Sequence, residues 1–138
     1  MIEKRGIYRI IDANLNRTME GLRVCEDIAR FVFNDSKRTL GYKNIRHQLV
    51  ELLKPMAIPR TLVVRARNIM ADVGKKSIPV ELQRKNVKDV FYANSQRAKE
   101  SVRVLEEFSK LHNGKCAQEF KKIRYQIYAL EKDIVEKF

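Results

Sequence analysis

The chain has 138 residues, enough for one hydrophobic core, and it carries a formal net charge of +12 with 33% of its residues charged. This balance predicts a polyanionic partner, such as nucleic acid, a phosphorylated metabolite or an acidic membrane surface, unless the basic residues only solvate exposed helix faces. No apolar run approaches the ~20 residues of a membrane span, and the N-terminus lacks the apolar run of a signal peptide. Cys25 and Cys116 form no C-x-x-C pair. We therefore expect a soluble protein of the reducing cytoplasm.

The first half of the chain predicts two helices. Apolar residues recur at steps of three and four from residue 10 to about residue 33, as in an amphipathic helix. Residues 34–36 read as a turn, with Ser36 as the N-cap of a second helix that ends near Leu53, before Pro55.

The second half begins with a segment of a different kind. Residues 54–80 hold all three prolines and predict an irregular crossover, with a short extended piece at 61–64. A third helix should begin near Pro79 or Asn86 and run to about His112, where Asn113-Gly114 predicts a left-handed stop. The last helix should cover residues 115 to about 137.

An internal repeat organises these helices. The motif A-N-x-x-R-x-x-E-x-x-R-V-x-E begins at Ala13 and again at Ala93, and a second match relates residues 42–48 to 120–126. Because each copy spans two segments, the duplicated unit is a helix pair. The sequence therefore predicts a single all-α domain over residues 1–138, a bundle of four long helices with repeats at 9–53 and 89–131 and one longer irregular crossover at about 54–80.

Several polar residues fall within the apolar arcs of these helices, and burying them without partners would be costly. They are Asn14, Arg17 and Glu26 in the first helix, Arg46 in the second, Asn94, Arg97 and Glu106 in the third, and Arg124 in the fourth. In one alternative, Arg17 pairs with Glu106 and Arg97 with Glu26 across the interface between the first and third helices. In the other, the arginines line an anion pocket, since guanidinium groups bind phosphate oxygens bidentately. The asparagines would then bind a ring edge or brace the arginines.

Other motifs are few. The chain has no nucleotide-binding glycine loop, no kinase catalytic-loop signature and no metal spacing between His47 and His112. The loop at residues 72–76 joins a carboxylate, a glycine and two lysines, which suits Mg²⁺ and nucleotide phosphates as well as a solvated turn.

The segment RIIDANLNRTMEGLRVCEDIARF at residues 9–31 closely resembles the opening of a bacterial family of thiamine biosynthesis, the monofunctional hydroxymethylpyrimidine phosphate kinases. Members are often fused to the N-terminus of thiamine-phosphate synthase. Further matching positions cover almost the whole chain; they are residues 45–47, 67, 72–74, 93–97, 103–108 and 123–125.

The resemblance implies ATP-dependent phosphorylation of 4-amino-5-hydroxymethyl-2-methylpyrimidine phosphate to its diphosphate, with ATP and Mg²⁺ as cofactors. The nucleophile would be a phosphate oxygen, so no dedicated base is needed. Position and resemblance together give the expected roles. Phosphate is bound by Arg17, Arg46, Arg97 and Arg124, with help from Arg67 and Lys75 or Lys76 in the crossover. The catalytic residues are Arg17, Arg97, Glu20 and Glu100. Asp72 holds Mg²⁺, with Glu20 or Glu100 as alternatives, and Asn14, Asn94 and His47 orient the pyrimidine or a phosphate.

Two other classes of protein compete with the kinase. A basic helical nucleic-acid module needs its cations on one exposed face, whereas several arginines here lie in apolar arcs. A non-catalytic accessory domain of thiamine-phosphate synthase needs no embedded arginines. Expected partners are the phosphorylated pyrimidine, ATP and a thiamine-phosphate synthase, with no membrane; a homo-oligomer that completes the pocket is left open.

Overall fold

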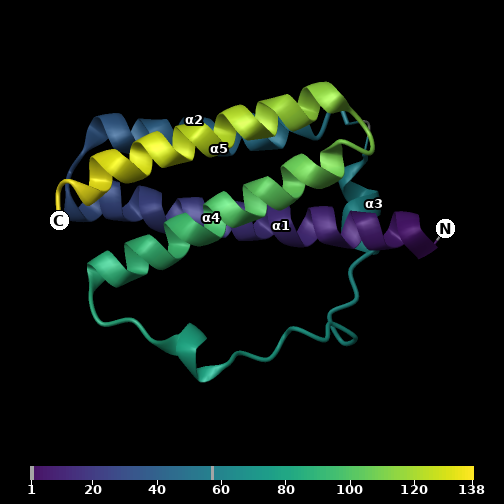
Figure 1. Ribbon diagram of the computed structural model, residues 1–138, viewed down its shortest axis with the longest axis horizontal. Coiled ribbons are helices and arrows are strands. Elements are labelled where there is room, and N and C mark those ends of the chain that lie inside the picture. Colours follow the sequence, from purple (N-terminus) through teal and green to yellow (C-terminus); the bar gives the residue numbers. More distant parts are fainter. Residues whose placement is uncertain (1, 57) are drawn as a thin grey trace.

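The computed structural model describes residues 2–56 and 58–138, and within them it contains helices and no strand (Figure 1). The elements are α1 (Ile2–Asp27), the π-helical turn η1 (Ile28–Val32), α2 (Ser36–Leu52), α3 (Arg60–Arg65), the 3₁₀ turn η2 (Pro79–Leu82), α4 (Val87–Ser109) and α5 (Gly114–Val135). The predicted all-α bundle of four long helices is confirmed. Among the described residues, no helix combines the length and hydropathy needed to cross a bilayer.

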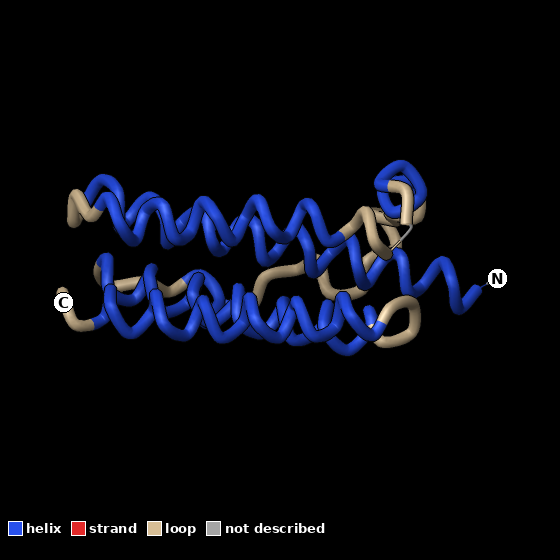
Figure 2. Tube along the Cα trace, turned by 90° about the horizontal axis from the view of Figure 1, so that it is seen from above, coloured by secondary structure: helices blue, strands red, loops and turns tan. Residues whose placement is uncertain are grey.

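The four long helices run side by side along one axis (Figures 1 and 2). α1 and α2 are antiparallel neighbours, as are α4 and α5, and the crossover returns along the bundle before α4 begins (Figure 1). α1 packs on α4, and α2 packs on α5. The duplicated helix pair predicted from the repeat is therefore present: α4 and α5 stand in the second half where α1 and α2 stand in the first.

The contact between α1 and α4 shows the duplication at atomic scale. The hydroxyls of Thr18 and Ser101 lie 2.6 Å apart and form a buried hydrogen bond. The repeat offset of 80 residues relates Thr18 to Ala98 and Ser101 to Gly21. Ala98 and Gly21 also face each other where α1 crosses α4. The two contacts are thus equivalent under an approximate two-fold axis between α1 and α4.

The core lies between the four long helices. Its largest fully buried side chains come from every one of them: Ile11 and Leu22 from α1, Tyr42 and Leu49 from α2, Phe91 and Leu105 from α4, and Phe120, Ile123, Ile127 and Ile134 from α5. Burial of apolar surface at roughly 25 cal/mol per Å² makes this shared core the main term that holds the two repeats together.

Several local predictions need correction. The N-cap of α2 is Asp35, whose Oδ1 accepts the backbone N–H of Arg38 at 3.0 Å, and Ser36 is the first helical residue. Asn113 and Gly114 form no left-handed stop, because Asn113 is the N-cap of α5 and Gly114 begins that helix. α4 begins at Val87 after the N-cap Asn86, one of the two predicted starts.

The predicted extended piece at residues 61–64 is wrong, since these residues belong to α3. Val63 in α3 and the C-cap residue Ala66 are both buried, and their spacing of three residues places them on the same side of this short helix. Burial of this face outweighs the β-propensity of a short Thr and Val run, which depends on context.

Candidate functional site

A pocket of about 500 Å³ lies between the N-terminal half of α1 and the start of the crossover. Its polar lining comes from both segments: Arg9, Asp12, Asn14 and Arg17 on α1, and Arg67, Asn68 and Asp72 after α3. Four of the predicted site residues, Asn14, Arg17, Arg67 and Asp72, are thus brought together, although 50 residues or more separate the two segments in the sequence.

An ion pair joins the crossover to α1 at this pocket. Arg67 donates from Nε to Asp12 Oδ2 at 2.5 Å and from Nη2 to Asp12 Oδ1 at 2.8 Å. Asp12 is only 8% exposed, and its Oδ1 also accepts from Asn16 Nδ2 at 3.2 Å. The hydrogen bonds to Asp12 raise the pKa of the Arg67 guanidinium, which keeps its charge at any working pH. This bidentate pair fixes where the crossover leaves α3.

Two other guanidinium groups in the pocket carry no such counter-charge. Within the described residues, neither Arg9 nor Arg17 has a carboxylate at ion-pair distance. Arg17 Nη1 donates to Asn14 Oδ1 at 3.4 Å, while Asn14 Nδ2 donates to the carbonyl of Ile10 at 2.8 Å. Both polar atoms of the buried Asn14 amide therefore have a partner within α1, and one of these partners is Arg17. The role of Asn14 in orienting a pyrimidine stays a prediction.

Arg46 and Arg124 lie elsewhere, each against a carboxylate of its own repeat. Arg46 donates to both oxygens of Glu26, from Nε at 3.0 Å and from Nη2 at 3.1 Å, and Arg124 Nη2 donates to Glu106 at 3.1 Å. All four side chains are largely buried. The proposed alternative of Arg17 with Glu106 and Arg97 with Glu26 is wrong, because each glutamate pairs with the second helix of its own repeat.

The remaining predicted residues do not line the pocket. Arg97 and Glu20 are exposed on α4 and α1, His47 is exposed on α2, and Lys75 is exposed in the crossover. Glu100 accepts from Gln96 Nε2 at 2.9 Å, and Asn94 repeats the bond of Asn14 by donating to the carbonyl of Val90 at 2.8 Å. Glu100 and Arg124 share a different depression of about 400 Å³ on α4 and α5, where Lys99 and Arg103 are also engaged with carboxylates.

Sequence reasoning missed Arg9 and Asp12. Asp12 lies three residues before Leu15 and seven before Met19, so it belongs to the same apolar arc of the helix as Glu26. The same helical wheel could have found it. Arg9 has no such signal, because its role depends on the crossover that folds beside it.

The metal prediction depends on Asp72. Its Oδ1 accepts the backbone N–H of Gly74 at 3.0 Å, and the side chain is exposed at the edge of the pocket. Within the described residues, no group of three or more His, Cys, Asp or Glu side chains is placed to hold a metal ion. Asp72 alone could add one carboxylate to a Mg²⁺ ion carried by ligand phosphates, as proteins often bind this ion. The expectation of ATP and Mg²⁺ stays a prediction.

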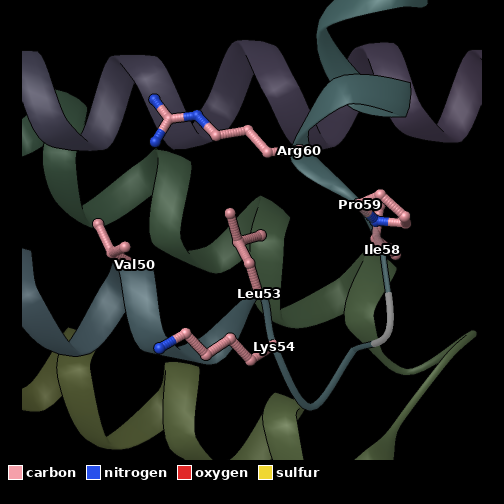
Figure 3. A pocket seen from close by; sticks show the side chains of 6 residues that line it. All are labelled: Val50, Leu53, Lys54, Ile58, Pro59 and Arg60. Carbon is pink, nitrogen blue, oxygen red and sulfur yellow. The ribbon is translucent and has the colours of Figure 1, made fainter.

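A second pocket, of about 530 Å³, opens between the end of α2 and the start of α3 (Figure 3). Val50, Leu53, Ile58 and Pro59 give it an apolar floor, and the stems of Lys54 and Arg60 border it (Figure 3). Lys54 pairs with Glu51 at 3.0 Å. This second pocket contains none of the predicted site residues, and its lining suits apolar groups better than phosphate.

The chain is similar over nearly its whole length to proteins named thiamine-phosphate synthase. It is 38% identical over 130 residues to the one from Nostoc punctiforme, 40% over 138 residues to one from Prochlorococcus marinus, and 35% over 133 residues to the one from Rhodopirellula baltica. These matches cover 94 to 96% of this chain but only 35 to 36% of the relatives, so the chain spans about a third of their length. No solved structure matches the chain significantly.

The prediction that the chain is a kinase is contradicted by these names. The relatives are named for the synthesis of thiamine phosphate, which is a different reaction from phosphorylation of a pyrimidine phosphate. The resemblance is therefore confirmed at the level of thiamine biosynthesis and of similarity to proteins named thiamine-phosphate synthase, and the assignment as a monofunctional kinase is wrong.

The family itself is shown by a match that covers both repeats and the crossover. The model of the ThiD2 family matches residues 9–133, which include every residue of the α1–crossover pocket from Arg9 to Asp72. The chain belongs to the ThiD2 family, a family of thiamine biosynthesis.

Proposed function

We propose that this chain is a non-catalytic accessory domain that binds a phosphorylated pyrimidine for a thiamine-phosphate synthase, with the phosphate in the α1–crossover pocket. The observation that carries the proposal is the pair of guanidinium groups, Arg9 and Arg17, that have no carboxylate partner among the described residues. Charged donors held beside an open pocket favour an anionic ligand.

The charges of the pocket suit a phosphate monoester. Three arginines and two aspartates line it, and the pair of Asp12 with Arg67 is internally neutral. The charges that remain are the two guanidinium groups of Arg9 and Arg17 and the carboxylate of Asp72 at the edge of the pocket. A phosphate monoester is close to a dianion at pH 7, since its second pKa is about 6, and two guanidinium forks can hold it bidentately. A volume of about 500 Å³ lies within the range of small-molecule sites.

The accessory role is supported by the comparisons. The relatives carry a stretch similar to this chain within a protein about three times as long. A domain that binds one reactant beside the synthase raises the local concentration of that reactant, and a direct link between the two would strengthen the effect. The ligand we assign is 4-amino-5-hydroxymethyl-2-methylpyrimidine phosphate.

Isothermal titration calorimetry tests the proposal. The pyrimidine phosphate should bind, the unphosphorylated alcohol should not, and inorganic phosphate should compete. Replacing Arg9 or Arg17 with Ala removes a charge-assisted bond worth about 1.5–3 kcal/mol, so affinity should fall about tenfold or more.

The circular dichroism of both variants should remain that of the wild type, because Arg17 is exposed and Arg9 only half-buried. Equal affinity for phosphate ester and alcohol would exclude a phosphate site. ATP with and without Mg²⁺ serves as a second ligand, and tighter binding of ATP would replace the pyrimidine phosphate in the proposal.

A further inference from the structure

We infer that the duplicated chain has one ligand site and not two, and that the ion pair between Asp12 and Arg67 is the device that builds this site in the first repeat alone. The inference rests on the proposed function, because it concerns the number and origin of the phosphate sites. A duplication with the motif A-N-x-x-R in both copies would otherwise predict two equivalent sites.

The second repeat keeps the shared motif but not the rest of the pocket. Asn94 and Arg97 correspond to Asn14 and Arg17 at a spacing of 80 residues. At the same spacing, Arg9 corresponds to Asp89 and Asp12 to Tyr92. The first exchange reverses a charge, and the second removes the carboxylate that receives the crossover arginine.

Asp89 and Tyr92 have other tasks. Asp89 Oδ2 accepts the backbone N–H of Lys85 at 3.1 Å, while the N–H of Asp89 is capped by Asn86 Oδ1 at 2.9 Å. The ring of Tyr92 packs edge-on to Phe91, with centroids 6.2 Å apart. At the start of α4, Asp89 thus takes part in the hydrogen bonds of the helix N-terminus, and Tyr92 packs against Phe91. The carboxylate of Asp89 stands where the first repeat has the guanidinium of Arg9.

The crossover is the other asymmetric part. It follows α2 and passes the start of α1, where residues 67–72 form one wall of the pocket. At the corresponding place in the second repeat, after α5, the ring of Phe138 packs against Phe91 at 5.9 Å and against Phe33 at 5.1 Å. Phe91 corresponds to the buried Ile11 at the spacing of 80 residues, so this apolar contact extends the core at the start of α4 and supplies no polar side chain comparable to Arg67 or Asp72.

These observations assign distinct roles within the first repeat. Arg9 and Arg17 contact the phosphate. Asp12 and Arg67 are positioning residues, because their charges neutralise each other and their bidentate bonds hold the wall of the pocket in place. Loss of the pair should weaken binding without changing the number of ligands bound.

Calorimetry with the pyrimidine phosphate counts the sites, and variants at equivalent positions locate them. We expect one ligand per chain, a loss of affinity of about tenfold or more in Arg17→Ala, and less than a twofold change in its counterpart Arg97→Ala. Asp12→Asn should bind one ligand more weakly, and trypsin should cut its crossover faster than in the wild type, whereas Arg97→Ala should be cut at the wild-type rate.

The outcomes separate the two proposals. Two ligands per chain, or equal losses in Arg17→Ala and Arg97→Ala, would overturn the single site and leave the proposed phosphate-binding function in place. No binding of the phosphate ester by the wild type would overturn both. Unchanged affinity and unchanged cleavage in Asp12→Asn would overturn the positioning role of the ion pair.

Discussion

Buried ion pairs carry the clearest consequences of single residues in this protein. Glu26 lies almost fully buried between α1 and α2, where Arg46 binds both of its oxygens and Arg23 Nη1 adds a third bond at 2.9 Å. Replacing one member of a buried pair leaves the other charge without compensation. We expect Glu26→Gln to lower the free energy of unfolding by about 3–5 kcal/mol in urea titrations. The exposed Glu20→Gln should change it by less than about 0.5 kcal/mol, and equal effects would contradict the structural role of Glu26.

Asp35 gives a residue-scale prediction that depends on pH. The backbone N–H of Arg38 lowers the pKa of Asp35 most, and Lys137, whose Nζ lies 3.2 Å from Oδ2, lowers it further. Because the folded pKa is below the unfolded value of about 3.9, the stabilisation is present above that pH and is lost as the pH falls through the folded pKa. Asp35→Asn keeps an N-cap but not the charge, so it should be less stable than the wild type at pH 7. The difference in melting temperature should shrink towards pH 2, whereas a constant difference would exclude the charge effect.

At the scale of elements, the crossing of α1 and α4 depends on the absence of a side chain at Gly21. A Cβ atom there would lie 2.7 Å from the backbone oxygen of Asn94, which cannot move without shifting α4. Gly21→Ala should therefore lower the free energy of unfolding by about 1–3 kcal/mol in urea, despite the better helix propensity of alanine. The matched control is Gly114→Ala, which meets no atom within 4 Å and should be neutral or stabilising. An unchanged stability in Gly21→Ala would show that the helices separate at little cost.

The elements also show how far sequence patterns reach. Periodicity and the repeat were sufficient for the four long helices and their pairing, since both signals extend over many turns. They failed at α3, where burial decides the conformation of a short segment. They also failed at Asn113, which caps the start of α5 and does not end α4 in a left-handed turn. For the site, the wheel identified Asn14 and Arg17 but could not say which helix supplies the partner of Glu26. That choice depends on the reach of long side chains across an interface, which periodicity does not contain.

At the scale of the whole molecule, the crossover separates what folds the protein from what forms the pocket. Residues 67–79 and 82–88 are exposed, while the core joins side chains from α1, α2, α4 and α5 and also Met56, Ile58 and Val63 from the first part of the crossover. The part of the crossover that follows α3 therefore contributes little to the bundle, and its first residues line the pocket. This division explains why the repeat alone predicted the fold and could not predict a site that is built by the unrepeated segment.

Limited proteolysis checks this division. Trypsin should cut first after Lys75 or Lys76 in the exposed crossover, because exposed backbone outside helices opens most readily for a protease. The two fragments should stay together in gel filtration and keep their helical circular dichroism, since α1 packs on α4 and α2 on α5 across the cut. Saturating pyrimidine phosphate should slow the cut, as residues 67–72 would then be held against the ligand. As a control, a variant with both lysines changed to Gln should resist cleavage at this position. Early cuts within α1 or α4, or fragments that separate without denaturant, would show that the bundle is not stable without an intact crossover.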